Sequence, residues 1–84
     1  MWRLEWTARA LADVERLGAR IRKRIFQTME RFAQTGHGDI RRVQESEGEL
    51  AVRVGKWRVF FVQMEAERVI RVRRVRSRGS AYQK

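Results

Sequence analysis

Arginine is concentrated in the last third of the chain, inside segments that have the pattern of β-strands. Residues 49–84 carry ten Lys or Arg against three Asp or Glu, whereas residues 1–48 carry ten against seven. Guanidinium groups fixed on strands form a preorganised cationic surface, which suits phosphates and can stabilise the charge that develops on a reacting phosphodiester. The arginines of this kind are Arg53, Arg58, Arg71, Arg73, Arg74, Arg76 and Arg78, and Tyr82 follows them.

The composition of the whole chain points to an anionic partner. Its 84 residues include 20 Lys or Arg and 10 Asp or Glu, which give a formal net charge of +10. A charge of this size favours nucleic acid or an acidic protein as partner. The length predicts one domain over residues 1–84, with a hydrophobic content of 43% that is enough for one small core.

Metal and membrane functions are not expected. The chain has no cysteine and a single histidine, His37 in a glycine-rich segment, so we expect no metal site and no small-molecule cofactor. No apolar stretch approaches the roughly 20 residues that span a bilayer. Charges at Arg3 and Glu5 interrupt any signal-peptide core, and a cytoplasmic protein without a membrane association is therefore expected.

Hydrophobic periodicity predicts the element order β-α-α-β-β-β-β. Thr7 is typical of a helix N-cap, and Gly18 is expected to stop the first helix. The pair Gly55-Lys56 suits a two-residue hairpin turn. The predicted helices cover residues 8–17 and about 19–34, and the predicted strands cover residues 2–6, part of 39–45, about 49–54, 57–64 and 68–76.

This order predicts an α+β fold. An N-terminal strand and a two-helix hairpin would pack with a four- to five-stranded, mostly antiparallel sheet, the helices on one face. Alternation along the strand from Trp57 places Val59 and Phe61 on one face, and Arg58 and Phe60 on the other. Because helices cover one face, we expect the arginines to converge on the open one, although each alone has the alternative of an ordinary solvated side chain.

Several segments resemble the RelE/ParE family of toxins. Residues 50–61 (LAVRVGKWRVFF) resemble a strand pair of that family, and residues 75–82 (VRSRGSAY) resemble its closing motif. The strand at residues 2–6, the first helix and the junction Leu17-Gly18 resemble its start. The resemblance covers nearly the whole chain and implies a RelE-like fold and the toxin component of a type II toxin–antitoxin system.

The resemblance also implies an activity. RelE-type toxins cleave messenger RNA, typically on the ribosome and without a metal, by attack of a ribose 2′-OH on the adjacent phosphate. By motif position, Arg58 would stabilise the transition state, Arg78 would bind the phosphate or protonate the leaving oxygen, and Tyr82 would orient or deprotonate the 2′-OH. The residues expected to bind RNA beside these are Arg53, Lys56, Arg73 and Arg76.

The chain also departs from the family pattern, and alternatives stay open. Ser77 stands where the closing motif often has histidine, and Glu49 and Ala51 stand where some active members have basic residues. A carboxylate, Glu47 or Glu49, is a candidate replacement for the base. The alternatives are a ParE-like inhibitor of DNA gyrase without nuclease activity, and a non-catalytic basic module that binds nucleic acid or an antitoxin.

The expected partners follow from the same resemblance. A cognate antitoxin would lay an acidic segment, helical when bound, over the arginines and hide the site. Messenger RNA and the ribosome are the expected targets. The tryptophans Trp2, Trp6 and Trp57 are candidates for base stacking, but at least two of them are expected in the core because they share strand faces with apolar neighbours.

Overall fold

The computed structural model describes residues 1–43 and 48–77. Within them the chain forms five strands and two helices in the predicted order. No helix in this part of the chain is long and apolar enough to cross a membrane. The elements are β1 (Arg3–Trp6), α1 (Ala8–Glu15), α2 (Ala19–Thr35), β2 (Ile40–Arg42), β3 (Glu49–Val54), β4 (Trp57–Met64) and β5 (Val69–Ser77).

The strands form one mixed sheet in the order β1-β5-β4-β3-β2. The pairs β2–β3, β3–β4 and β4–β5 are antiparallel, and β1 is parallel to β5. Gly55 in the β3–β4 turn has a φ of 61°, a left-handed conformation that favours glycine. The predicted α+β class and the mostly antiparallel sheet are confirmed.

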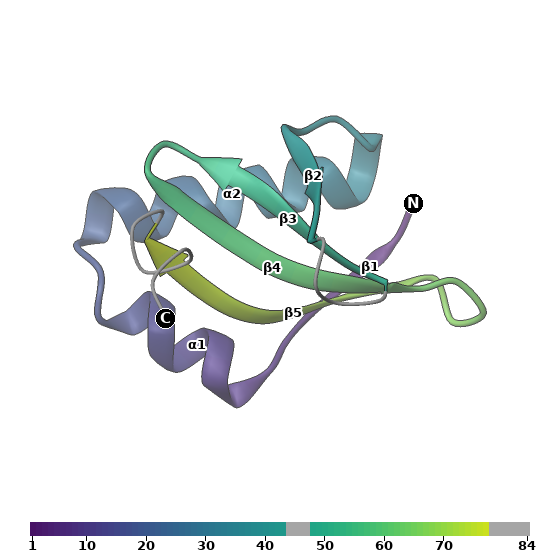
Figure 1. Ribbon diagram of the computed structural model, residues 1–84, viewed down its shortest axis with the longest axis horizontal. Helices are drawn as coiled ribbons and strands as arrows, with labels where there is room; N and C mark the ends of the chain where they lie inside the picture. Colours follow the sequence, from purple (N-terminus) through teal and green to yellow (C-terminus); the bar gives the residue numbers. More distant parts are fainter. Residues whose placement is uncertain (44–47, 78–84) are drawn as a thin grey trace.

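The helices leave one face of the sheet open. Helix α2 runs behind the sheet, and α1 lies along its β5 side (Figure 1). The apolar stripe of α2, which includes Ile25 and Met29, packs on the inner face, where Val59 and Phe61 are fully buried. The three tryptophans are half-buried and pack against this core without being fully buried in it.

Helix α1 covers the part of β5 that β1 does not reach. Strand β1 pairs with β5 as far as Val72. Beyond that point the backbone N–H of Thr7 donates to the carbonyl of Val72 at 3.0 Å, and the Thr7 hydroxyl donates to the carbonyl of Arg73 at 3.2 Å. The side chain of Asp13 accepts from the N–H of Val75 at 2.8 Å. Asp13 of α1 and the N-cap residue Thr7 therefore satisfy backbone groups of a strand edge that would otherwise be bare.

The role of Gly18 was predicted wrongly. Helix α1 ends at Glu15 with Arg16 at its C-cap, whereas Gly18 is the N-cap of α2 with φ −63° and ψ 157°. The helix ends early because the amides of Arg16 and Leu17 turn back to the carbonyls of Asp13 and Val14. Gly18 therefore needs no left-handed backbone.

Replacing Thr7 should weaken the docking of α1. The Thr7 hydroxyl accepts from the N–H of Ala10 as an N-cap and donates to the carbonyl of Arg73. We expect Thr7→Ala to lower the free energy of unfolding by about 1–2 kcal/mol in urea titrations. Thr28→Ala, inside α2, is the control and should leave stability unchanged or slightly higher. Equal stability of Thr7→Ala and the wild type would contradict this account of α1.

Candidate functional site

Three arginines lie side by side across the open face. Arg53 on β3 pairs with Arg58 on β4, and Arg58 pairs with Arg76 on β5. Directly opposed residues of neighbouring strands point to the same face, and like charges in these positions are destabilising. Arg53 and Arg76 are exposed and Arg58 is half-buried. We call these three residues the arginine row; the structure brings them together, and their chemical role stays a prediction.

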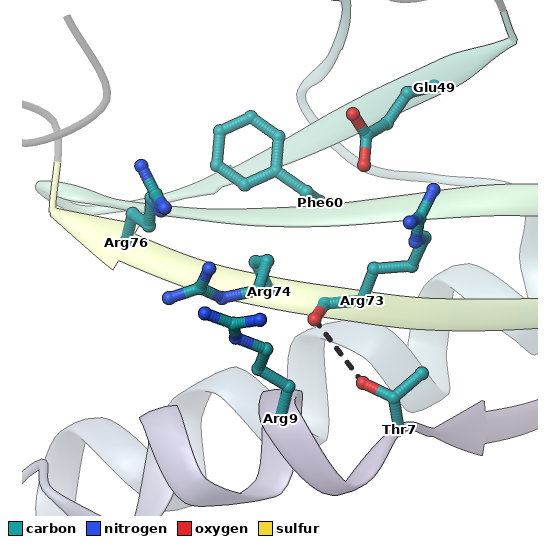
Figure 2. A pocket seen from close by; sticks show the side chains of 7 residues that line it. All are labelled: Thr7, Arg9, Glu49, Phe60, Arg73, Arg74 and Arg76. Carbon is teal, nitrogen blue, oxygen red and sulfur yellow. Dashed lines mark hydrogen bonds between the residues drawn. The ribbon is translucent and has the colours of Figure 1, made fainter. Parts of the chain in front are cut away.

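A groove of about 650 Å³ adjoins the arginine row on the same face. Phe60 lies between the rim residues Arg76 and Glu49, and α1 forms the opposite border (Figure 2). Among the described residues, the groove therefore has an aromatic ring, one carboxylate and several guanidinium groups around it. Its lining residues are Thr7, Arg9, Glu49, Phe60, Arg73, Arg74 and Arg76.

A bulge in β5 adds to the positive charge of this groove. Phe60 pairs with Arg74 but Phe61 pairs with Val72, so Arg73 has no partner residue in β4. In a regular strand Arg73 and Arg74 would point to opposite faces, whereas here both line the groove. The bulge thereby brings two successive arginines to one site.

Arg74 is held in place by Asp13 of α1. Its Nε donates to one carboxylate oxygen at 2.9 Å and its Nη2 donates to the other at 3.4 Å. Burial by itself would raise the pKa of Asp13. The hydrogen bonds from Arg74 and from the N–H of Val75, with the charges of Arg74 and Arg16, outweigh burial and lower that pKa below its ordinary value of 3.8. The carboxylate is thus fixed in its charged form and offsets the charge of Arg74.

The remaining arginines of the groove have no ion-pair partner among the described residues. Within residues 1–43 and 48–77, Arg9, Arg73 and Arg76 make no ion pair. The carboxylate of Glu49 faces Arg73 across the groove without reaching ion-pair distance (Figure 2). The groove can therefore offer three guanidinium groups to an anion.

The other residues expected in the site lie outside the groove or beyond the described residues. The expectation that Arg71 joins the groove is wrong, because its Nε donates to Glu5 at 3.1 Å and it does not line the groove. Lys56 lies in the β3–β4 turn, with its Nζ 6.0 Å from the centroid of the Trp57 ring, and does not line the groove. Ser77 ends β5 opposite Trp57. Arg78, Tyr82 and Glu47 lie outside the described residues. His37 is exposed, and the described part of the chain contains no cluster of metal-binding side chains.

Sequence reasoning missed two features of the site. Arg9 was not singled out, although its place two residues after the N-cap Thr7 puts it beside the end of β1. Phe60 was assigned to the open face but was given no role. The bulge at Arg73 carries no signal in the sequence that would have joined these residues.

Comparisons with known proteins agree with this geometry. A family model described as the ParE toxin of the type II toxin–antitoxin system parDE matches residues 4–82. No curated protein matches the sequence.

Solved structures of similar fold come from several organisms. The RelB–RelE complex of Methanococcus jannaschii matches at 23% identity and a TM-score of 0.76, covering 93% of this chain and 94% of that one. The RelE–RelB complex of Pyrococcus horikoshii matches at 14% identity and a TM-score of 0.78, covering 93% of this chain and 96% of that one. The YoeB/ParE toxin of Agrobacterium tumefaciens matches at 19% identity and a TM-score of 0.74, covering 89% of this chain and 96% of that one.

Asp13→Asn should destabilise the protein in a pH-dependent way. Because folding lowers the pKa of Asp13, its carboxylate contributes stability above the ordinary value of 3.8, and this contribution disappears as the pH falls through the lowered pKa. At neutral pH the free energy of unfolding should fall by about 1–3 kcal/mol. Below about pH 4 the difference in this free energy between the variant and the wild type should become smaller. Urea titrations from pH 3 to 7 test this, with the exposed Glu15→Gln as control; a gap that is constant with pH would contradict it.

Neutralising one member of the arginine row should stabilise the fold. Arg53→Gln removes a like charge opposite Arg58, and its melting temperature should exceed that of the wild type at low ionic strength. The difference should vanish near 1 M salt, where screening acts within about 3 Å. Arg41→Gln is the matched control, since Arg41 pairs with Asp39 at 3.4 Å and its loss should bring no gain. A melting temperature of Arg53→Gln below that of the wild type would contradict repulsion within the row.

Proposed function

The chain belongs to the RelE/ParE family of toxins of type II toxin–antitoxin systems, and we propose that it acts as a metal-independent endoribonuclease that cleaves messenger RNA on the ribosome. The observation that carries this proposal is the arginine row next to a groove with one carboxylate. Guanidinium groups from three strands meet on one open face, where a phosphate can approach.

The proposed reaction follows from these groups. The 2′-oxygen of a ribose attacks the adjacent phosphorus, its proton passes to a base, and the 5′-oxygen leaves with a proton from an acid. Negative charge grows on the phosphate oxygens, and Arg58 and Arg76 would stabilise it by charge-assisted hydrogen bonds. Arg58 is half-buried, and a cation that is partly shielded from water acts more strongly on this charge.

Proton transfer would fall to three residues. We propose Glu49 as the base, because its carboxylate borders the groove and faces the arginine side (Figure 2). Arg78 and Tyr82, from the motif that resembles the family's closing segment, would bind the phosphate, protonate the leaving oxygen and orient the 2′-OH. Tyrosine has an ordinary pKa far above neutrality, so as a base Tyr82 would need nearby cations that lower its pKa.

We propose a cognate antitoxin as the partner that controls this site. The two archaeal structures reported above are complexes of a toxin with its antitoxin. In this chain, Arg9, Arg73 and Arg76 are without an ion pair among the described residues. An acidic antitoxin segment would neutralise them and exclude RNA at the same time.

A ParE-like action on DNA gyrase is the second candidate. Two observations favour it: the family model that matches is that of the ParE toxin, and Ser77 stands where the nuclease motif often has histidine. Such a toxin would bind gyrase through its surface and would hydrolyse no RNA. The same experiment separates both candidates.

Arg58→Ala should lower the rate of RNA cleavage by about a hundredfold to a thousandfold, since it removes one preorganised cation from the transition state. The measurement is the mapping of RNA 5′ ends on translating ribosomes treated with purified protein, with EDTA present. Arg31→Ala, an exposed arginine on α2, is the matched control and should cleave like the wild type. Circular dichroism should show that both variants are folded.

Two results would contradict the nuclease proposal. One is intact messenger RNA at a dose of wild-type protein that arrests growth. The other is cleavage by Arg58→Ala at the rate of the wild type. Growth arrest with intact RNA and trapped gyrase–DNA complexes would establish the second candidate instead.

A further inference from the structure

The groove extends beyond the arginine row toward α1. At the row the open face carries three guanidinium groups in line. Beside the row, the ring of Phe60 lies on one border of the groove, the bulge residues Arg73 and Arg74 follow on β5, and Arg9 of α1 with its N-cap Thr7 lies on the opposite border (Figure 2). The catalytic roles proposed above leave Phe60 and Arg9 without a function.

Within residues 1–43 and 48–77, Phe60 is placed unlike the other aromatic residues. The rings of Trp6 and Phe26 contact each other edge to face, with their centroids 4.8 Å apart, and the centroids of Phe32 and Phe61 are 5.2 Å apart. All four rings pack in or against the helix-covered core. Phe60 instead lies on the open face, half-buried, between the buried Ala51 on β3 and Arg74 on β5. An apolar ring in a cationic groove offers a stacking surface to a planar group.

Of the arginines around this ring, one is held by a carboxylate, and two have no ion pair among the described residues. Arg74 is bound by both carboxylate oxygens of Asp13 and serves as a wall of the groove. Arg9 and Arg73 make no ion pair within the described residues and line the groove from α1 and from the bulge. The volume of about 650 Å³ lies within the range of cavities that hold a small organic ligand.

We infer that this part of the groove binds one nucleotide of single-stranded RNA beside the scissile phosphate, with its base stacked on Phe60 and its phosphate held by Arg9 and Arg73. This inference rests on the proposed function and adds a binding subsite to it. A paired base is stacked within its duplex and cannot lie on a protein ring, so the RNA bound here is single-stranded. The contact is to the face of a base, which every base has, so the subsite tolerates different sequences.

The test measures binding without cleavage. The probe is a fluorescent hexanucleotide with 2′-O-methyl groups on all sugars, which removes the attacking hydroxyl. Phe60→Leu should bind it about tenfold to a hundredfold more weakly than the wild type, and Phe60→Tyr should bind it like the wild type. Phe26→Leu, which alters a ring on the other side of the sheet, is the control for a loss of packing and should keep full affinity.

Probes that lack one base locate the contact. At one position of the hexanucleotide, removal of the base should weaken binding to the wild type and abolish the difference between wild type and Phe60→Leu. Arg9→Gln should reduce the slope of log affinity against log salt by about 0.7, the value for one phosphate of a single strand. Arg16→Gln on the same helix is its control and should leave the slope unchanged.

The outcomes separate this inference from the proposed function. The subsite would be overturned if Phe60→Leu bound the hexanucleotide as tightly as the wild type does. It would also be overturned if Phe60→Leu lost the same affinity relative to the wild type on every probe, whichever base is removed. Ribosomal cleavage with an unchanged KM in Phe60→Leu would also overturn it and leave the nuclease proposal standing. If Phe60→Leu lost affinity at one probe position only, and the wild-type protein cleaved no RNA, the subsite would be supported and the nuclease proposal would be refuted.

Discussion

The docking of α1 on the second half of β5 is the contact on which the open face depends. Strand β1 ends at Trp6, and the backbone of β5 beyond Val72 needs other hydrogen-bond partners. Thr7 and Asp13 supply them, and Asp13 also binds Arg74 with both oxygens. At the bulge, the carbonyl of Arg73 accepts from the hydroxyl of Thr7, the N-cap of α1. One short helix thus closes the sheet edge and sets the wall of the groove.

The same architecture explains why the open face carries unfavourable charge. Helix α2 takes the apolar side chains of the sheet, and the other face is left to arginines that oppose one another on β3, β4 and β5. We expect opposed like charges to repel one another in the free protein, at a cost in stability. A phosphate or an acidic segment that binds there removes this cost, so the repulsion in the free protein adds to the preference for an anionic partner. This view joins the proposed nuclease site to the proposed control by an antitoxin.

Much of the fold could be predicted from the sequence, because local signals agreed with one another. Alternation in residues 57–62 placed Arg58 on the open face, and the apolar stripe with Ile25 and Met29 defined the inner side of α2. The groove could not be predicted in the same way. It depends on a bulge opposite the junction of Phe60 and Phe61, and on a hydrogen bond between Asp13 and Val75, 62 residues apart. Both arise from tertiary packing, which leaves no periodic trace in the sequence.

The central claim is that the open face receives a phosphate backbone, and that the exposed arginines Arg20 and Arg31 of α2 do not. Its most direct test is NMR of the arginine Nε–Hε groups during titration with a 2′-O-methyl oligonucleotide, assigned through single arginine-to-lysine variants. This account predicts saturable shifts at Arg58, Arg76 and Arg73, with Arg20 and Arg31 of α2 unchanged. Shifts confined to α2, with the arginine row unaffected at saturation, would contradict it.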